Sequence, residues 1–185
     1  MSHDDSALAL ATLGGGCFWC LEAVFARLRG VVGVVSGYGG GHLAQPSYAH
    51  VCAGDTGHAE VAQVRYDPDS IGYRDILEVF FAVHDPTTRN RQGGDVGTQY
   101  RSVIFTHSAE QAATARAVIE ELQASRAFAA AVVTEVAAAG EFWPAEDYHQ
   151  QYFELNGRQP YCQVVVAPKL AKFVHKFGDR LKPAD

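Results

Sequence analysis

The sequence has no apolar run long enough to span a membrane and no cluster of basic side chains. It carries 15 Lys and Arg against 21 Asp and Glu, a formal net charge of −6, and its cations are scattered. This distribution argues against nucleic acid or an acidic membrane surface as the main partner. The amino-terminal stretch MSHDDSALALATLGGG also lacks the basic and apolar regions of a secretory signal. We therefore expect a cytoplasmic protein, whose four cysteines are thiols, ligands or catalysts rather than structural disulfides.

The length of 185 residues and a hydrophobic content of 48% fit one domain with a sizeable core. Residues 1–185 are expected to form this single domain, with flexible tails at 1–6 and 179–185. Strands are expected at 7–13, 31–36, 60–66, 102–106, 132–137 and 163–166, and helices at 18–28, 73–83, 108–124, 146–155 and 169–177. The intervening segments 37–57 and 87–100 are polar and glycine-bearing, and we expect loops there. This interleaving predicts an α+β fold, a two-layer, ferredoxin-like α/β sandwich with helices on a central mixed sheet.

The motif GGGCFWC at residues 14–20 lacks the companions that a metal or nucleotide site needs. A structural zinc site would need a second, closely spaced pair of ligands, but Cys52 and Cys162 stand alone. A phosphate-binding loop would continue into GK[ST] or a third spaced glycine, and neither follows. We therefore expect no metal and no cofactor.

Thiol chemistry is the remaining interpretation of the motif. Cys17 follows a predicted strand and begins a predicted helix, where the helix dipole stabilises a thiolate. Cys17 and Cys20 are three residues apart, close enough to pair as a thioredoxin-like dithiol. The bulky Phe18 and Trp19 between them count against exchange with protein disulfides, which needs open access to the sulfur. Phe18 fits a helical core position, whereas Trp19 falls off the apolar stripe and points toward a pocket or loop.

Three residues farther along the chain have ordinary interpretations when each is taken alone. Glu60 begins an otherwise apolar strand, and strand alternation allows it to face solvent. Tyr48 and Tyr100 lie in the polar segments, where tyrosines usually form edges of the core. The residues by themselves therefore leave a general dithiol oxidoreductase and a binding module without turnover open.

The segments GGCFWC, SGYGGG, PSYAHVCAGDTGHAEVAQVRYDP, HDPTTRNRQGGDVGTQYRS and EDYHQQY occur in this order. Together they resemble the A-type peptide methionine sulfoxide reductases, over roughly residues 10–172. The resemblance implies reduction of methionine S-sulfoxide, free or in proteins, with repair of oxidative damage as the purpose. We also expect a monomer.

The resemblance also implies roles for individual side chains. Cys17 is expected to be the nucleophile, and Glu60 the acid, because apolar surroundings keep a carboxyl protonated. The expected substrate-binding and stabilising residues are Phe18 and Trp19 around the methyl group, Tyr48 and Tyr100 at the oxygen, Asp95 at the backbone of the substrate, and His149 and Tyr152 in support.

Recycling of the enzyme is implied to pass through a Cys17 sulfenic acid and an intramolecular disulfide that thioredoxin reduces. Several relatives carry recycling cysteines in a glycine-rich tail, but this chain ends KFVHKFGDRLKPAD. We expect Cys162 to be the resolving cysteine, with Cys20, which replaces the usual glycine, as the alternative that would strain a helix turn. Cys52 is expected to be a buried structural thiol.

Overall fold

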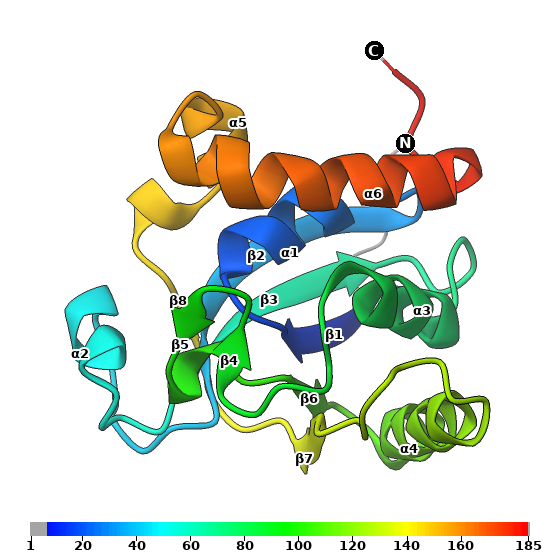
Figure 1. Ribbon diagram of the computed structural model, residues 1–185, viewed down its shortest axis with the longest axis horizontal. Coiled ribbons are helices and arrows are strands. Elements are labelled where there is room, and N and C mark those ends of the chain that lie inside the picture. The colour runs from blue at the N-terminus through cyan, green and yellow to red at the C-terminus, as the bar shows by residue number, and fades with distance from the viewer. Residues whose placement is uncertain (1–6, 185) are drawn as a thin grey trace.

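The computed structural model describes residues 7–184 and arranges them around one six-stranded sheet (Figure 1). The strands are β1 (Ala9–Gly14), β2 (Val31–Gly39), β3 (Ala59–Tyr66), β6 (Val103–Thr106), β7 (Glu135–Ala138) and β8 (Phe142–Pro144). Their order is β7-β6-β1-β3-β2-β8, and every neighbouring pair is antiparallel except β6 and β7. The predicted mixed sheet is therefore confirmed.

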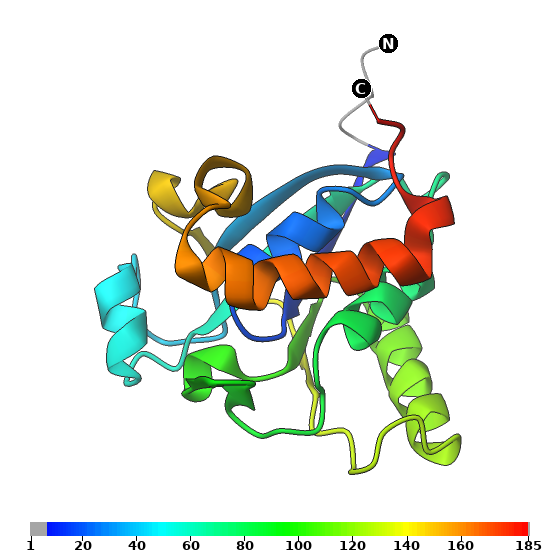
Figure 2. The same cartoon turned by 45° about the horizontal axis from the view of Figure 1, so that its top comes forward.

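The helices are α1 (Phe18–Phe25), α2 (Tyr48–Ala53), α3 (Tyr73–Val83), α4 (Ala109–Ala124), α5 (Tyr152–Asn156) and α6 (Ala167–Phe177). Four of them, α1, α3, α4 and α6, share one core cluster with the sheet, in which Leu13, Phe25, Phe80 and Phe173 are fully buried. Figures 1 and 2 both show α6 lying along α1 on this face. The predicted α+β fold with helices packed on the sheet is thus confirmed, and the finer ferredoxin-like description stays a prediction.

The strand predicted at 163–166 is wrong. Cys162–Val166 forms a π-helical turn that continues into α6. The run of valines favoured a strand, but the buried positions recur at Cys162 and Val166 while Val164 between them is 73% exposed. That spacing is helical, because packing against α1 outweighs the strand preference of β-branched residues.

The segments predicted as loops contain short regular elements, and one predicted helix is interrupted. The segment 37–57 contains the end of β2 and the short helix α2, and the segment 87–100 contains a small hairpin of β4 (Arg91–Gln92) and β5 (Asp95–Val96). Strand β8 was not predicted either. The helix expected at 146–155 is broken into a 3-10 turn, Asp147–His149, and α5.

The carboxy-terminal segment is attached to the body of the protein. Leu181 forms a bridge with Leu28, the Arg29 N–H donates to the Arg180 carbonyl at 2.8 Å, and the Lys182 N–H donates to the Arg27 carbonyl at 2.9 Å. The predicted tail at 179–185 is therefore shorter than expected, and the tail predicted at 1–6 lies outside the described residues. Within residues 7–184 no helix combines the length and the apolar character that a membrane crossing requires.

Deleting residues 179–185 should lower the free energy of unfolding by roughly 1–3 kcal/mol, because two backbone hydrogen bonds and the Leu181 contact are lost. Urea unfolding of the truncated and full chains measures this difference. Deletion of residues 183–185 alone is the control and should leave the midpoint unchanged. Equal midpoints for both deletions would show that the attachment contributes no stability.

Candidate active site

A turn of three glycines brings Cys17 to the end of the sheet. β1 ends at Gly14, and Cys17 caps the amino terminus of α1. A Cβ would come within 3.0 Å of Val103 at Gly14, of Phe80 at Gly15 and of Gln92 at Gly16. Gly16 also has φ +94°, a backbone conformation that favours glycine. The glycine run is therefore needed because three different elements press against the turn.

A cavity of about 370 Å³ opens beside this turn. Figure 1 shows α2, the β4–β5 hairpin and α5 grouped around the start of α1. The lining residues are Cys17, Phe18, Trp19, Tyr48, Glu60, Asp95, Tyr100, Tyr152, Gln159, Pro160 and Tyr161. The structure thus brings eight of the predicted site residues together, from segments up to 135 positions apart in the chain (Cys17 to Tyr152).

Glu60 is a buried carboxyl on the floor of this cavity, with 2% of its surface exposed. Its Oε2 accepts a hydrogen bond from the Phe18 backbone N–H at 3.1 Å. Burial raises the pKa of Glu60 well above its ordinary value, the charge of Cys17 raises it further, and the Phe18 bond acts in the opposite direction. Burial and the charge of Cys17 therefore favour the protonated form of the carboxyl, and the solvent-facing interpretation of Glu60 is excluded.

Cys17 is 7% exposed, and burial raises the pKa of its thiol. The helix start was expected to lower this pKa, but desolvation and the neighbouring Cys20 outweigh it. Cys17 and Cys20 share a hydrogen bond, and that bond lowers the pKa of Cys20, with a further contribution from the charge of Lys169. The two thiols and Glu60 are therefore a coupled group, in which one negative charge disfavours the next.

Trp19 forms one wall of the cavity and is held by two partners. Its ring stacks on Tyr152 at a centroid distance of 3.7 Å and an interplanar angle of 6°. Its Nε1–H donates to Nδ1 of His149 at 3.1 Å. Phe18 is 1% exposed and packs beside His149 at 5.1 Å between ring centroids. The wall is therefore held by contacts on both sides of the indole, and Trp19 faces a pocket, as its position off the helical stripe predicted.

Tyrosine hydroxyls and one carboxylate provide the polar part of the lining. Burial raises the pKa of both Tyr48 and Tyr100, so both remain hydrogen-bond donors. The Tyr48 hydroxyl bonds to the Cys52 thiol. Asp95 accepts a hydrogen bond from the Tyr161 hydroxyl at 2.6 Å. Tyr161 was not predicted, although it directly precedes Cys162 in the sequence.

Other predicted residues lie outside the lining. His149 is 1% exposed and stands behind Trp19, so it supports the wall and does not line the cavity. Cys20 and Cys162 are buried in the same apolar cluster as Cys17. Cys52 is exposed, which corrects the expectation of a buried structural thiol: α2 turns it toward the surface. All four cysteines are free thiols.

The raised pKa of Glu60 predicts a pH-dependent stability. Above the ordinary value of 4.5 the carboxyl ionises in the unfolded chain but stays protonated in the folded protein, so the folded state binds more protons and stability falls as pH rises. Glu60→Gln removes this loss while keeping the acceptor for Phe18. Relative to that of the wild type, the free energy of unfolding of the variant should rise by up to about 1.4 kcal/mol per pH unit, until the pH exceeds the pKa of Glu60 in the folded protein.

Urea unfolding between about pH 5 and pH 8 measures that difference. Glu120→Gln, at an exposed position of α4, is the control and should differ from the wild type by a constant amount. A constant difference for Glu60→Gln as well would mean that the Glu60 pKa is not raised.

Known proteins share this sequence and this fold. The model of the peptide methionine sulfoxide reductase family matches residues 9–181. Peptide methionine sulfoxide reductase MsrA of Polynucleobacter asymbioticus is 56% identical over 176 residues, which are 95% of this chain and 93% of that protein. Mxr1 of Saccharomyces cerevisiae, solved in reduced form, has a TM-score of 0.78 and 37% identity, covering 87% of this chain and 92% of that one.

A second yeast structure, of Mxr1 in complex with Trx2, has a TM-score of 0.56 and 27% identity and covers 82% of this chain and 89% of that one. The match to the family model and to the bacterial relative spans almost the whole chain. The cavity adds a thiol, a buried carboxyl with a raised pKa and an apolar wall in one place. The chain therefore belongs to the peptide methionine sulfoxide reductase family and is a thiol-dependent methionine sulfoxide reductase.

Proposed function

We propose that Cys17 attacks the sulfur of methionine S-sulfoxide, free or in a protein, while Glu60 supplies the proton. The observation that carries this proposal is the shared cavity floor, where the buried Glu60 carboxyl is bound to the N–H of the residue after Cys17. A sulfoxide sulfur becomes a good electrophile only when its oxygen is protonated or strongly hydrogen-bonded. An acid beside a thiol supplies the proton for that oxygen next to the attacking sulfur.

The interaction between Cys17 and Glu60 decides which of the two side chains carries the proton. The charge of a Cys17 thiolate raises the pKa of Glu60, so ionisation of the thiol favours the protonated carboxyl. When Cys17 is the thiolate, Glu60 carries the proton that the sulfoxide oxygen needs. The sulfur–oxygen bond of the sulfoxide breaks, the oxygen ends on Cys17 as a sulfenic acid, and methionine leaves. One thiol is oxidised for each sulfoxide reduced.

The rest of the lining would orient the substrate. Phe18 and Trp19 offer the methyl group an apolar surface, and Asp95 would bind the substrate backbone. Tyr100 and Tyr48 would donate hydrogen bonds to the oxygen as its charge develops. The Tyr48 hydroxyl must first exchange its Cys52 partner for that oxygen.

We propose that Cys20 resolves the sulfenic acid and that Cys162 then exchanges with it. Cys20 already shares a hydrogen bond with Cys17, and neighbouring groups lower its pKa. Attack of its thiolate on the Cys17 sulfenic acid forms a disulfide and releases water. Cys162, in the same buried cluster, attacks the Cys20 sulfur and frees Cys17 for another cycle. This order revises the preference for Cys162 alone, because the start of α1 already holds Cys17 and Cys20 together.

The final disulfide would be reduced by thioredoxin, which receives it by the same exchange. A solved complex of the yeast relative Mxr1 with Trx2 supports this partner. The free thiols and the reductant that they require suit a cytoplasmic enzyme that works as a monomer in repairing oxidised proteins.

Cys17→Ser should abolish the release of methionine, and Glu60→Gln should slow it by about 100-fold or more, the usual scale for a general acid. Methionine release in a single turnover, without added reductant, measures both effects. With excess dithiothreitol and a mixture of the two sulfoxide diastereomers, the wild type should consume only one of them. Consumption of neither diastereomer would point to a general dithiol oxidoreductase or a binding module, and consumption of both at equal rates would contradict the preference for the S-sulfoxide. Release at the wild-type rate in either variant would remove that residue from its role.

Cysteine variants separate the proposed relay from direct resolution by Cys162. After one equivalent of sulfoxide, Cys20→Ser should retain a Cys17 sulfenic acid that dimedone labels. Cys162→Ser should retain a Cys17–Cys20 disulfide, cycle normally with dithiothreitol and cycle slowly with thioredoxin. Alkylation and peptide mapping of quenched samples identify each species. A wild-type Cys17–Cys162 disulfide at the earliest times, with Cys20 free, contradicts the relay.

A further inference from the structure

Glu22 is a second buried acid that the proposed chemistry does not use. It lies on α1, is 5% exposed and does not line the cavity. Burial raises its pKa, and the charge of Glu154 adds to that shift. Among residues 7–184 no cation forms an ion pair with Glu22, since the nearby Arg27 pairs with Glu154. A buried carboxyl without a cation needs other partners to be stable.

Both oxygens of Glu22 accept hydrogen bonds from segments distant in the chain. Oε2 accepts from the Ser36 hydroxyl on β2 at 2.5 Å, and Oε1 accepts from the Gln151 backbone N–H. Gln151 has φ +53°, a left-handed conformation that costs a non-glycine residue energy and persists only where its surroundings fix it. Glu22 is one of the groups that hold this conformation in place.

Gln150 makes a second attachment at the same place. Its side-chain Oε1 accepts from the Ser36 N–H at 2.9 Å, and its Nε2 donates to the Ser36 carbonyl at 2.9 Å and to the Ala145 carbonyl at 3.1 Å. Residues 145–152, which we call the connector, are therefore attached to β2 through Ser36 and to α1 through Glu22. Ser36 directly precedes Gly37, where the pairing of β2 with β8 ends. These bonds therefore extend the attachment to β2 by one residue.

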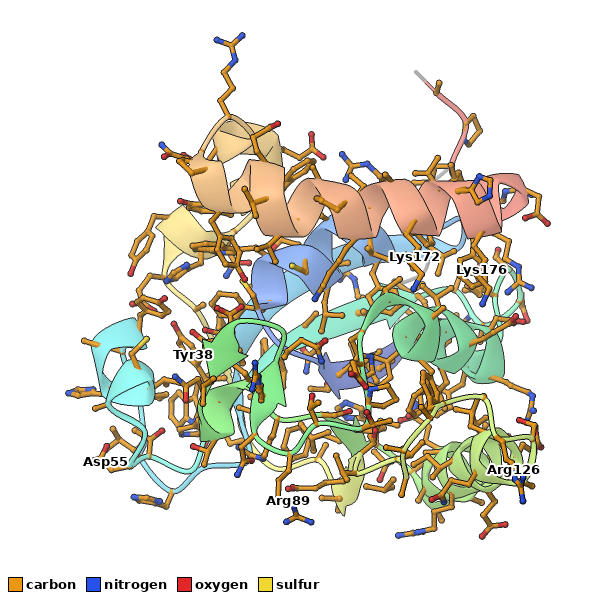
Figure 3. All side chains as sticks on the ribbon, in the orientation of Figure 1. Tyr38, Asp55, Arg89, Arg126, Lys172 and Lys176 are labelled. Carbon is orange, nitrogen blue, oxygen red and sulfur yellow. The ribbon has the colours of Figure 1, made fainter. Side chains whose placement is uncertain are left out.

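The connector carries the groups that hold two parts of the cavity. His149 accepts from Trp19, and Tyr152 stacks on the same ring. Glu146 accepts from the Tyr48 N–H at 3.0 Å and from the Tyr38 hydroxyl at 2.9 Å. Tyr38, labelled in Figure 3, is a fully buried residue of β2. A displaced connector would therefore move the Trp19 wall and loosen the start of α2.

We infer that Glu22 is a positioning residue, which fixes the connector and thereby the Trp19 wall and Tyr48 of the sulfoxide cavity. Trp19 and Glu22 lie three residues apart on α1, so the helix, the connector and the indole ring form a closed loop of contacts. This inference rests on the proposed function for its kinetic consequence. Its structural consequence, the placement of Trp19, is independent of that function.

Glu22→Ala and Glu22→Gln test this role. Alanine removes both accepted bonds. Glutamine keeps one oxygen for the Gln151 N–H, and its amide can donate to the Ser36 hydroxyl. We expect Glu22→Ala to raise the half-saturating sulfoxide concentration in single-turnover methionine release by about 10-fold, because small misplacements in a site cost one to two orders of magnitude. Glu22→Gln should stay within about 3-fold of the wild type, a rescue by retained shape and bonding.

Fluorescence gives a reading of Trp19 that does not depend on turnover. The chain has two tryptophans, so Trp143→Phe leaves Trp19 as the sole emitter. In that background Glu22→Ala should shift the emission to longer wavelength, and Glu22→Gln should not. Glu120→Ala, at an exposed position of α4, is the matched control and should change neither the emission nor the half-saturating concentration.

Two outcomes would overturn the inference. One is that Glu22→Ala keeps the emission wavelength and the half-saturating concentration of the wild type, even if its stability is lowered. The other is that Glu22→Gln is impaired as much as Glu22→Ala. If Glu22→Ala does not fold, Ser36→Ala removes one of the two bonds and should shift both readings in the same direction by a smaller amount; no shift overturns the inference. Failure of the wild type to release methionine would contradict the proposed function, and the emission would still decide the role of Glu22.

Discussion

The hydrogen bond from the Phe18 N–H to the Glu60 carboxyl is the contact on which the site depends. It joins the start of α1 to β3 and sets the acid next to the thiol of Cys17. The bond alone would favour an ionised carboxylate, but burial and the charge of Cys17 act more strongly in the other direction. A carboxyl that is both fixed in place and protonated can deliver a proton to an oxygen beside the attacking sulfur.

The surroundings of that contact explain the unusual sequence before it. The three glycines allow Val103, Phe80 and Gln92 to pack closely against the turn that leads to Cys17. The aromatic pair after Cys17 separates two tasks: Phe18 gives its backbone N–H to the acid, and Trp19 gives its ring to the cavity wall. In the proposed function, chemistry and substrate recognition are therefore assigned to consecutive residues of one helix start.

Local sequence signals were sufficient for most regular elements and for the position of Cys17 between a strand and a helix. Helical spacing after Cys17 gave α1, and the departure of Trp19 from that spacing correctly placed it at a cavity. The two ends of α2 carry ordinary capping signals, a side-chain cap at Ser47 and a left-handed φ of +84° at Gly54. This helix could therefore have been predicted from the sequence. The valines after Cys162 favoured a strand because β-branched residues prefer strands, whereas the packing of this turn against α1 is a tertiary effect.

The contacts that assemble the site could not be read from local patterns. Glu60, Asp95 and Tyr161 meet Cys17 across long stretches of chain, and only the resemblance to a family pointed to the first two. Glu22 looked like an ordinary helix residue, since nothing in its neighbourhood in the sequence reports that Ser36 and Gln151 would reach it. Buried polar residues of this kind are satisfied by partners that only the folded chain supplies.

The protonation state of Glu60 in the folded protein is the central claim, and infrared spectroscopy tests it most directly. Isotope labelling of glutamate carboxyls, with the spectrum of Glu60→Gln subtracted from that of the wild type at neutral pH, isolates this group. The account predicts the C=O stretch of a protonated carboxyl at neutral pH, well above the pH at which an ordinary glutamate ionises. A carboxylate band already complete at neutral pH would contradict it, because Glu60 would then have no proton to give.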